Sequence, residues 1–555
     1  MLPEESELKN QTSQNLISRD RQPKKDPYIP ETSEQENATT SGGTIDRLKG
    51  TGVLSRFPVE IWEKIFRDTC ALVPFGLQIR VFFEEETWPG VPLLGVRCLP
   101  LTISHVSSLW RVIVRNLPSL WSSIAVELQF PNHDLEIARH LKIFLSNSRE
   151  HYPLIIRLSL RGGGHSESLQ VLAANFPRCR ELIIEACSGD AIHSAISHSD
   201  LDPSSVFPKL QLVTICDDPA PMPDEKTGRL FWAALSAAPR LTGVRLFLKN
   251  SDFSASDLTG PNHLPSQQIT SLELELAQLD ASDLRHFPSL RELSVHVDRD
   301  NGILESSLEP ATVIELSSLV SLAISGHSFF AIKGLLALFS TLHLPILRKL
   351  EVNAYHCVAW PEHVKLGSAD FLDLDGRLSS LTKLLWNFYA TTPSEEADIV
   401  ACFPWILQYA KNLTELHVEK YGIDPIPDAG SGHAAGDAFA VRLFDLFSSS
   451  PKRSDPETGL PKLKGLYIWD ATLARPDEVL ASSVRNLLLS RARFLDFEEL
   501  TFNWCSADHF AGAQVCCMEV ASVLDMSIWP GPRWSIGHEL EREAPDLGWM
   551  MDISD

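Results

Sequence analysis

The sequence predicts a mixed α/β fold in which short strands and helices alternate and stack side by side as a solenoid. A six-residue unit with apolar residues at its first, fourth and sixth positions recurs twelve times between Ile155 and Leu489. A proline stands two residues before the unit in seven copies. Because proline ends helices and favours extended geometry in the preceding residue, it marks the change from helix to strand. Between the units, apolar residues recur three and four apart, as in amphipathic helices, for example over 135–145 and 332–339.

Each unit also predicts two faces for its strand. The fourth and sixth residues are two apart, so both side chains point to the same side of the strand. Residues two, four and six after the first point to the other side, where a row of parallel strands would gather them on one surface, a common binding face of solenoids. These positions hold many glutamates, which are either a solvated acidic face or part of a binding surface. The candidates for binding a target are Arg245, Glu415, His417, Tyr467 and Trp469.

Composition and charge restrict the partners that the chain can have. With 555 residues, the chain is long enough for two or more cooperative units. Its 49 basic residues against 72 acidic ones give a net charge of −23, which would repel nucleic acid and anionic membranes. Residues 1–50 are polar and are expected to form a disordered tail without a secretory signal. The sequence therefore predicts an intracellular protein, in the cytoplasm or the nucleus.

Three blocks near the N-terminus have a recognisable order. Residues 54–66 (LSRFPVEIWEKIF) place Pro58 at the first turn of an amphipathic helix, where its missing N–H costs nothing. Residues 101–115 (LTISHVSSLWRVIVR) form a second amphipathic segment, and residues 116–128 (NLPSLWSSIAVEL) continue through a turn into alternating apolar residues. Residues 71–100 separate the first two blocks and are longer than a compact helix–helix linker.

These three blocks resemble the F-box-like proteins of fungi, and the recurring units resemble the irregular leucine-rich repeats that follow the F-box in that family. The resemblance implies a disordered tail over 1–50, a small helical F-box-like domain over 51–130 with an insertion at about 71–100, a leucine-rich-repeat domain over 131–510 and a C-terminal segment over 511–555. It further implies a substrate-recognition adaptor of a Skp–cullin–F-box ubiquitin ligase, acting in ubiquitin-dependent degradation.

In such an assembly the F-box binds a Skp-type adaptor and, through it, a cullin–RING ligase, while the repeats bind a target protein. By this resemblance, the residues at the adaptor contact would be Pro58, Ile61, Trp62, Ile65, Phe66, Val106 and Trp110. Alternatively, these apolar residues form the core of the module itself. The insertion at about 71–100 favours a second hypothesis, a repeat-based interaction scaffold outside any ubiquitin ligase.

The sequence offers no support for catalysis. It contains neither a phosphate-binding Gly-x-x-x-x-Gly-Lys-Ser/Thr loop nor a Gly-x-Ser-x-Gly nucleophile turn. The densest group of metal-ligand types is Cys505, His509, Cys516 and Cys517, which lacks the paired spacing of a structural zinc site. We therefore expect no enzyme, no cofactor and no metal.

Overall fold

The computed structural model describes part of the chain, and all of that part belongs to one compact unit, Phe57–Asp555. The described residues are 57–71, 75–83, 92–128, 133–160, 166–185, 196, 202–216, 226–248, 264–276, 281–297, 313–355, 376–389, 406–421, 443, 462–470, 483, 499–504 and 533–535. The predicted tail, 1–50, and most of the predicted C-terminal segment, 511–555, lie outside them.

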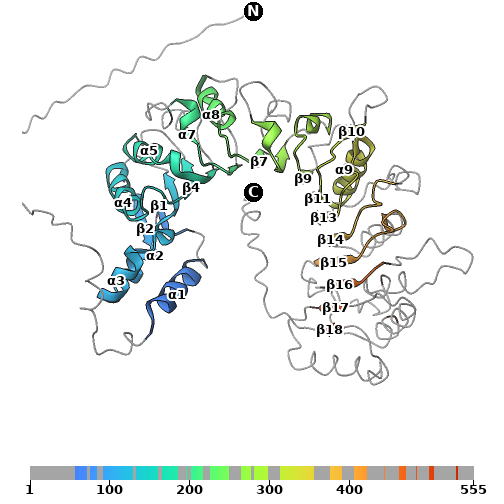
Figure 1. Cartoon of the computed structure of the whole chain (residues 1–555), viewed down its shortest axis with the longest axis horizontal. Helices are drawn as coiled ribbons and strands as arrows, with labels where there is room; N and C mark the ends of the chain where they lie inside the picture. Colours follow the sequence, from blue (N-terminus) through green and yellow to red (C-terminus); the bar gives the residue numbers. More distant parts are fainter. Residues whose placement is uncertain are drawn as a thin grey trace, which may run out of the picture. The chain divides into compact units, whose positions relative to one another are not determined.

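Sixteen of the described strands form one long sheet (Figure 1). The strands of this sheet are β1 (Leu77–Phe83), β2 (Pro92–Cys98), β3 (Ser123–Leu128), β4 (Leu154–Leu160), β5 (Cys179–Glu185), β6 (Leu212–Cys216), β7 (Gly243–Leu248), β8 (Ser271–Leu276), β9 (Glu292–Val297), β11 (Ser321–His327), β13 (Lys349–Tyr355), β14 (Lys383–Tyr389), β15 (Glu415–Tyr421), β16 (Gly465–Asp470), β17 (Glu499–Trp504) and β18 (Arg533–Ser535). From β3 onward they neighbour one another in chain order and run parallel. At the other end β1 lies parallel to β3, and β2 lies antiparallel to β1. This confirms a mixed α/β fold with a long parallel sheet, which is compatible with a solenoid.

Helices and short turns connect the strands. They are α1 (Val59–Ala71), α2 (Leu99–Ser104), α3 (Ser108–Arg115), η3 (Pro118–Trp121), α4 (Asp134–Asn147), α5 (Ser166–Ala173), η5 (Phe176–Arg178), α7 (Pro203–Val206), α8 (Lys226–Ser236), η7 (Ser266–Gln268), η8 (Ala281–His286) and α9 (Ser328–Thr341). A separate two-stranded ladder pairs β10 (Ile314–Glu315) with β12 (Leu342–His343). The segments predicted to be helical at 135–145 and 332–339 lie within α4 and α9.

The recurring unit explains the strands. In the ten copies from Cys179 to Ile468, the first, fourth and sixth residues are all buried, at no more than 2% exposure. Their fourth residues also lie opposite one another in the ladder, as Leu182 does with Val213 and Leu350 with Leu384. Burying each aliphatic side chain stabilises the fold by about 1.5–3 kcal/mol, so the register is strongly specified.

One predicted copy differs from the prediction, and one is not tested. In β4 the buried residues are Leu154, Ile156 and Leu158, and Ile156 aligns with Leu182. The copy predicted to begin at Ile155 is therefore shifted: the neighbouring ladder sets the register of this apolar run. The last copy, 484–489, lies outside the described residues.

The prolines mark a turn before the strand. At eight units the N–H of the first residue donates to the carbonyl three residues earlier, for example Leu290 to Phe287 at 3.1 Å and Leu347 to Leu344 at 3.3 Å. Pro288 and Pro345 occupy the second position of these turns, where their fixed φ suits the geometry.

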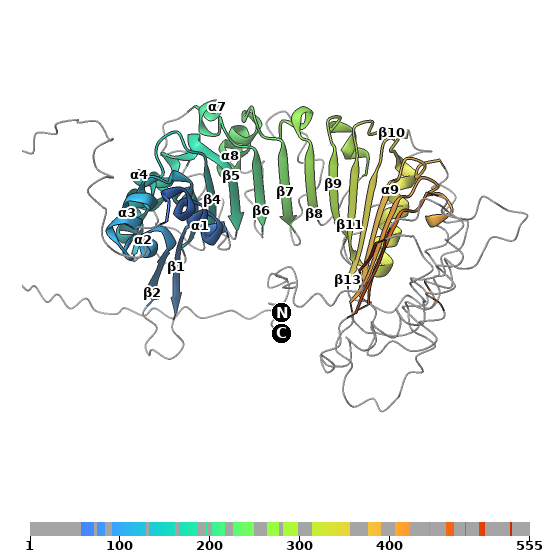
Figure 2. The same ribbon diagram turned by 60° about the horizontal axis from the view of Figure 1, so that its bottom comes forward.

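Helices cover one side of the sheet. The side chains that alternate with the buried ones along each strand point to the opposite side. Figure 1 shows α4, α5, α8 and α9 along one side of the row of strands. Among these, α9 packs against β9, β11 and β13 through the buried residues Leu335, Leu338 and Phe339. We call the other side, which carries the residues two, four and six places after the first residue of each unit, the open face. Figure 2 shows the strands side by side along it.

The segment predicted as an insertion, 71–100, contributes β1 and β2 to the sheet. Gly76 begins this addition, and a Cβ at this position would lie 2.6 Å from the backbone oxygen of Leu120. One buried core includes residues from both sides of the predicted domain boundary near 130, such as Trp121 and Phe144, whose rings are 5.4 Å apart. The boundary itself stays a prediction.

Candidate interaction surfaces

Exposed apolar side chains gather on α1 and at the turn between α2 and α3. Of the eight large apolar residues that are exposed in the described part of the chain, four lie here: Phe57, Ile61, Ile65 and Val106. Ile61 and Ile65 are one helical turn apart and so share a face of α1. We call these four residues the apolar set. Pro58 is also exposed, and its carbonyl accepts the N–H of Ile61 at 3.1 Å, which closes the first turn of α1.

Beneath the apolar set, three aromatic rings hold α1 against α3. Trp62 and Phe66 are buried, and their ring centroids lie 4.9 and 5.0 Å from that of Trp110. Trp110 is half-buried, and its Nε1 is buried without a hydrogen-bond partner among the described residues. Ser107 caps α3 by accepting the N–H of Trp110 at 3.1 Å. The residues predicted for adaptor binding therefore divide into an exposed group and an aromatic group that packs between the helices.

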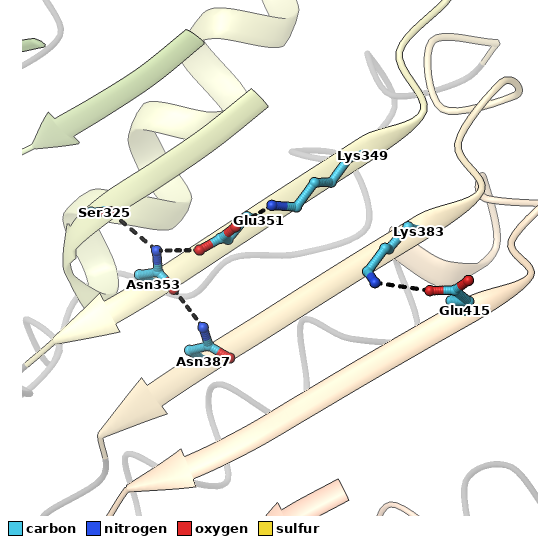
Figure 3. Close-up of polar contacts among 7 residues, drawn as sticks. All are labelled: Ser325, Lys349, Glu351, Asn353, Lys383, Asn387 and Glu415. Atoms are coloured by element: carbon cyan, nitrogen blue, oxygen red, sulfur yellow. Dashed lines mark hydrogen bonds and ion pairs between the residues drawn. The ribbon is translucent and has the colours of Figure 1, made fainter. Parts of the chain in front are cut away.

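The open face of β13 to β16 carries two stacked rings and paired charges, and Figure 3 shows the charge pairs of Lys349 and Lys383. Lys349 Nζ lies 2.8 Å from Glu351, and Lys383 Nζ lies 2.9 Å from Glu415. His417 Nε2 is 3.7 Å from the same Glu415 carboxylate. The His417 ring stacks on Tyr467, with centroids 4.1 Å apart. The hydrogen bond from Lys383 and the charges of Lys383 and His417 hold the pKa of Glu415 below its ordinary value, against a smaller opposing effect of burial.

A ladder of amides crosses the same face. Asn353 Nδ2 donates to Ser325 Oγ at 3.3 Å and to Glu351 at 3.1 Å, while Asn387 Nδ2 donates to Asn353 Oδ1 at 2.7 Å (Figure 3). These residues occupy equivalent positions on β11, β13 and β14. Their hydrogen bonds fix side chains that would otherwise lose rotamer entropy on binding a partner.

A second charged section lies on β7, β8 and β9. Arg245 Nε is 3.1 Å from Glu273, and His296 Nε2 is 3.5 Å from the buried Glu275. Burial raises the pKa of Glu273, Arg245 lowers it by a smaller amount, and Glu275 raises it further. Among the described residues, Glu273 therefore lies near one cation, Arg245, and one further carboxylate, Glu275.

The structure brings together only some of the residues predicted to bind a target. Glu415, His417 and Tyr467 are in contact, but Arg245 lies six strands away, on β7, which is about 29 Å at the usual strand spacing. Trp469 pairs through its backbone with Glu419, and its side chain lies outside the described part.

Sequence reasoning missed three residues of this face: Asn353, Lys383 and Asn387. All three lie two or six residues after the first residue of their units, so the rule that selected Glu415 contained the signal. Nothing in the sequence was a reason to select these two asparagines and this lysine over the other residues that occupy equivalent positions.

In the part of the chain that the structure describes, no group of three or more His, Cys, Asp or Glu side chains is placed to hold a metal ion. None of the helices in that part is both long and apolar enough to cross a membrane.

The fold and these surfaces define a mixed α/β protein with a long parallel sheet, an exposed apolar set at one end and a polar open face. No protein-family model matches the chain, and a search of curated proteins finds no match either.

Proposed function

We propose that the chain is the substrate-recognition adaptor of a Skp–cullin–F-box ubiquitin ligase. In this proposal α1, α2 and α3 are an F-box-like module that binds the Skp-type adaptor. The strands and helices that follow are leucine-rich repeats, and their open face holds the target protein. The chain positions the target, and the transfer chemistry belongs to its partners. The observation that carries the proposal is the apolar set on α1 and at the α2–α3 turn.

The energetics support a protein contact at the apolar set. Single exposed apolar residues are ordinary on protein surfaces, but half of those described here come from two short stretches around α1 and Val106. Burying an aliphatic side chain against a partner releases about 1.5–3 kcal/mol when burial is complete. Two or three such residues supported by a rigid aromatic layer form the kind of centre that dominates protein interfaces.

The test is binding of the full chain to the Skp-type adaptor of the same organism. The whole chain is required because β3 pairs with β4, so a cut after the third helix would break the sheet. The variants Ile61→Ser, Ile65→Ser and Val106→Ser remove exposed side chains and leave the Trp62–Phe66–Trp110 layer intact. We expect each to weaken binding by at least about tenfold, as interface centres do, measured by calorimetric titration.

Matched controls come from α4, where Leu135 and Ile143 are also exposed apolar residues. Leu135→Ser and Ile143→Ser should leave the adaptor affinity unchanged, with the same thermal stability as the other variants. Equal loss in both groups would indicate nonspecific hydrophobic association and would count against the proposal. Absence of binding by the folded wild-type chain would also reject it.

A second candidate function is a repeat-based interaction scaffold outside any ubiquitin ligase. The observation that favours it is the hairpin of β1 and β2, which stands between α1 and α2 and pairs with β3. The hairpin connects the N-terminal helices to the sheet. A helical module that only binds an adaptor does not need this connection. A folded chain that fails to bind the adaptor but recovers one partner through its open face would support this function.

A further inference from the structure

The open face of β7, β8 and β9 carries more negative than positive charge. Glu273, Glu275 and Glu292 lie four, six and two residues after the first residue of their units. The described cation on these strands is Arg245, joined by His296 when the imidazole is protonated. We call these five residues the acidic section.

The single arginine of the acidic section is already used. Arg245 pairs with Glu273 at 3.1 Å, while the exposed Glu292 accepts the Ser271 hydroxyl at 3.3 Å. Even beside Arg245, the pKa of Glu273 stays above its ordinary value, because burial and then Glu275 oppose its ionisation. Additional positive charge placed here would therefore be stabilised by at least two carboxylates.

An independent feature next to the acidic section also requires a partner. Thr214 lies opposite Arg245 in the parallel ladder and points to the open face, because Val213 and Ile215 on either side of it are in the core. The Thr214 residue is 6% exposed, and its Oγ1 has no hydrogen-bond partner among the described residues. A buried hydroxyl left unpaired is unfavourable, so a donor group from a ligand would find an acceptor beside the carboxylates.

We propose that the acidic section, with Thr214 at its border, binds a lysine- or arginine-rich segment of a partner protein. This inference rests on the proposed function in one respect: the segment would belong to the target of the ligase. Charge complementarity identifies the occupant. The chain carries a net charge of −23, so nucleic acid and a second copy of the chain are both repelled, whereas a basic segment is attracted from a distance.

Arginine suits this geometry best. A guanidinium can donate in pairs to a carboxylate and still offer an N–H to a neighbouring hydroxyl. Glu292 and Glu273 lie on strands β9 and β8, which are adjacent. Their carboxylates are therefore close enough for one extended basic segment crossing the strands to contact both.

The experiment measures binding of the full chain to a fluorescein-labelled peptide of alternating glycine, lysine and arginine. The matched probe has glutamine and citrulline in place of lysine and arginine. Measurements are made by fluorescence anisotropy at about 0.05 and 0.15 M salt, where the screening length shortens to about 8 Å. We expect the basic peptide to bind, the neutral probe not to bind, and the affinity to fall at the higher salt concentration.

Variants then locate the contact. The double variant Glu273→Gln with Glu292→Gln should weaken peptide binding about three- to tenfold, as expected for losing two partly exposed charge pairs. The control double variant, Glu136→Gln with Glu315→Gln, removes two carboxylates away from the open face and should leave the affinity unchanged. Thr214→Val keeps the shape of the side chain and should weaken binding about twofold or more. Ser294→Lys, which adds a cation to the acidic section, should weaken binding while every carboxylate is retained.

The inference is overturned if the wild-type chain binds the basic peptide no tighter than about 1 mM, or if the two double variants weaken binding equally. Unchanged peptide affinity in Thr214→Val would show that the Thr214 hydroxyl does not contact the peptide. All variants are also titrated with the Skp-type adaptor. Peptide binding without adaptor binding would reject only the proposed function, and adaptor binding without peptide binding would reject only this inference.

Discussion

Among single residues, Arg178 fixes the loop between α4 and β4 through several hydrogen bonds. Its guanidinium donates to Ser148 Oγ at 2.6 Å, to Asn175 Oδ1 at 2.9 Å and to the backbone carbonyl of Tyr152 at 3.4 Å. It also donates to the carbonyl of Arg149, the non-glycine residue with a φ of 56°. A planar group with several donors in fixed positions is needed for these contacts, and lysine cannot reproduce it.

We therefore expect Arg178→Lys to lower the free energy of unfolding by about 1–3 kcal/mol, since the buried Ser148 and the partly buried Asn175 and Tyr152 lose their donor. The measurement is urea unfolding followed by circular dichroism. Arg180→Lys, at an exposed position two residues along β5, serves as the control and should change the free energy by less than about 0.5 kcal/mol. Equal effects of the two variants would mean that the network does not stabilise this loop.

Glu415 makes the stability depend on pH. Its pKa is lowered below the ordinary 4.5, chiefly by the hydrogen bond from Lys383. A lowered pKa in the folded state contributes stability above pH 4.5, and this contribution is lost as the pH falls through the lower, folded value. We expect Glu415→Gln to be less stable than wild type at neutral pH and the difference to disappear in strong acid. Urea unfolding at a series of pH values measures it; a constant difference at all pH values would contradict the assignment.

At the scale of elements, α1 has one buried face and one exposed face, and both carry apolar residues. Its buried face supplies Trp62 and Phe66 to the aromatic layer, and its exposed face supplies Ile61 and Ile65. The apolar spacing of residues 54–66 predicted the helix but could not assign the faces, because Ile61, Trp62, Ile65 and Phe66 are all apolar. Only the position of α3, with Trp110 between the rings, decides which of them are covered.

The two faces of α1 should respond differently to truncation. Phe66→Ala should cost about 3–5 kcal/mol, the usual loss for a large buried aromatic residue. Ile65→Ala, one position earlier on the exposed face, should change stability by less than about 0.5 kcal/mol. Thermal unfolding of the two variants tests this, and a large loss in Ile65→Ala would show that the apolar set is part of the core.

The element scale also shows what the sequence could predict. In ten units the spacing of aliphatic residues identified the strands and their buried residues, because burial on one side fixes a strand's register. It did not predict β1 and β2, whose residues follow no unit, nor the register of β4, where Leu154, Ile155 and Ile156 are all aliphatic. On the open face, the pattern selected positions correctly but could not rank them, because contacts such as that of His417 with Tyr467 depend on the neighbouring strand.

For the whole molecule, the continuous sheet makes stability depend on neighbouring strands. In solenoids each unit contacts mainly its neighbours, and the terminal units must be covered. Here β1 and β2 extend the sheet beyond β3, and Trp121 donates through Nε1 to the carbonyl of Val114 at 2.9 Å, which joins α3 to the strand region. The N-terminal helices and the first strands are therefore expected to unfold together.

A fragment ending at Leu128 tests this dependence. It would keep α1, α2, α3 and β1 to β3, but it would lose β4, which pairs with β3, and Phe144, whose ring lies 5.4 Å from that of Trp121. The edge of β3, which carries the buried Ile124 and Val126, would be left unpaired and would favour association. We expect the fragment 57–128 to show no cooperative thermal transition and to self-associate in sedimentation experiments, whereas a chain from Phe57 to Asp555 unfolds cooperatively. A monomeric fragment with a sharp transition would show instead that the N-terminal helices form an independent domain, and adaptor binding could then be measured on the fragment alone.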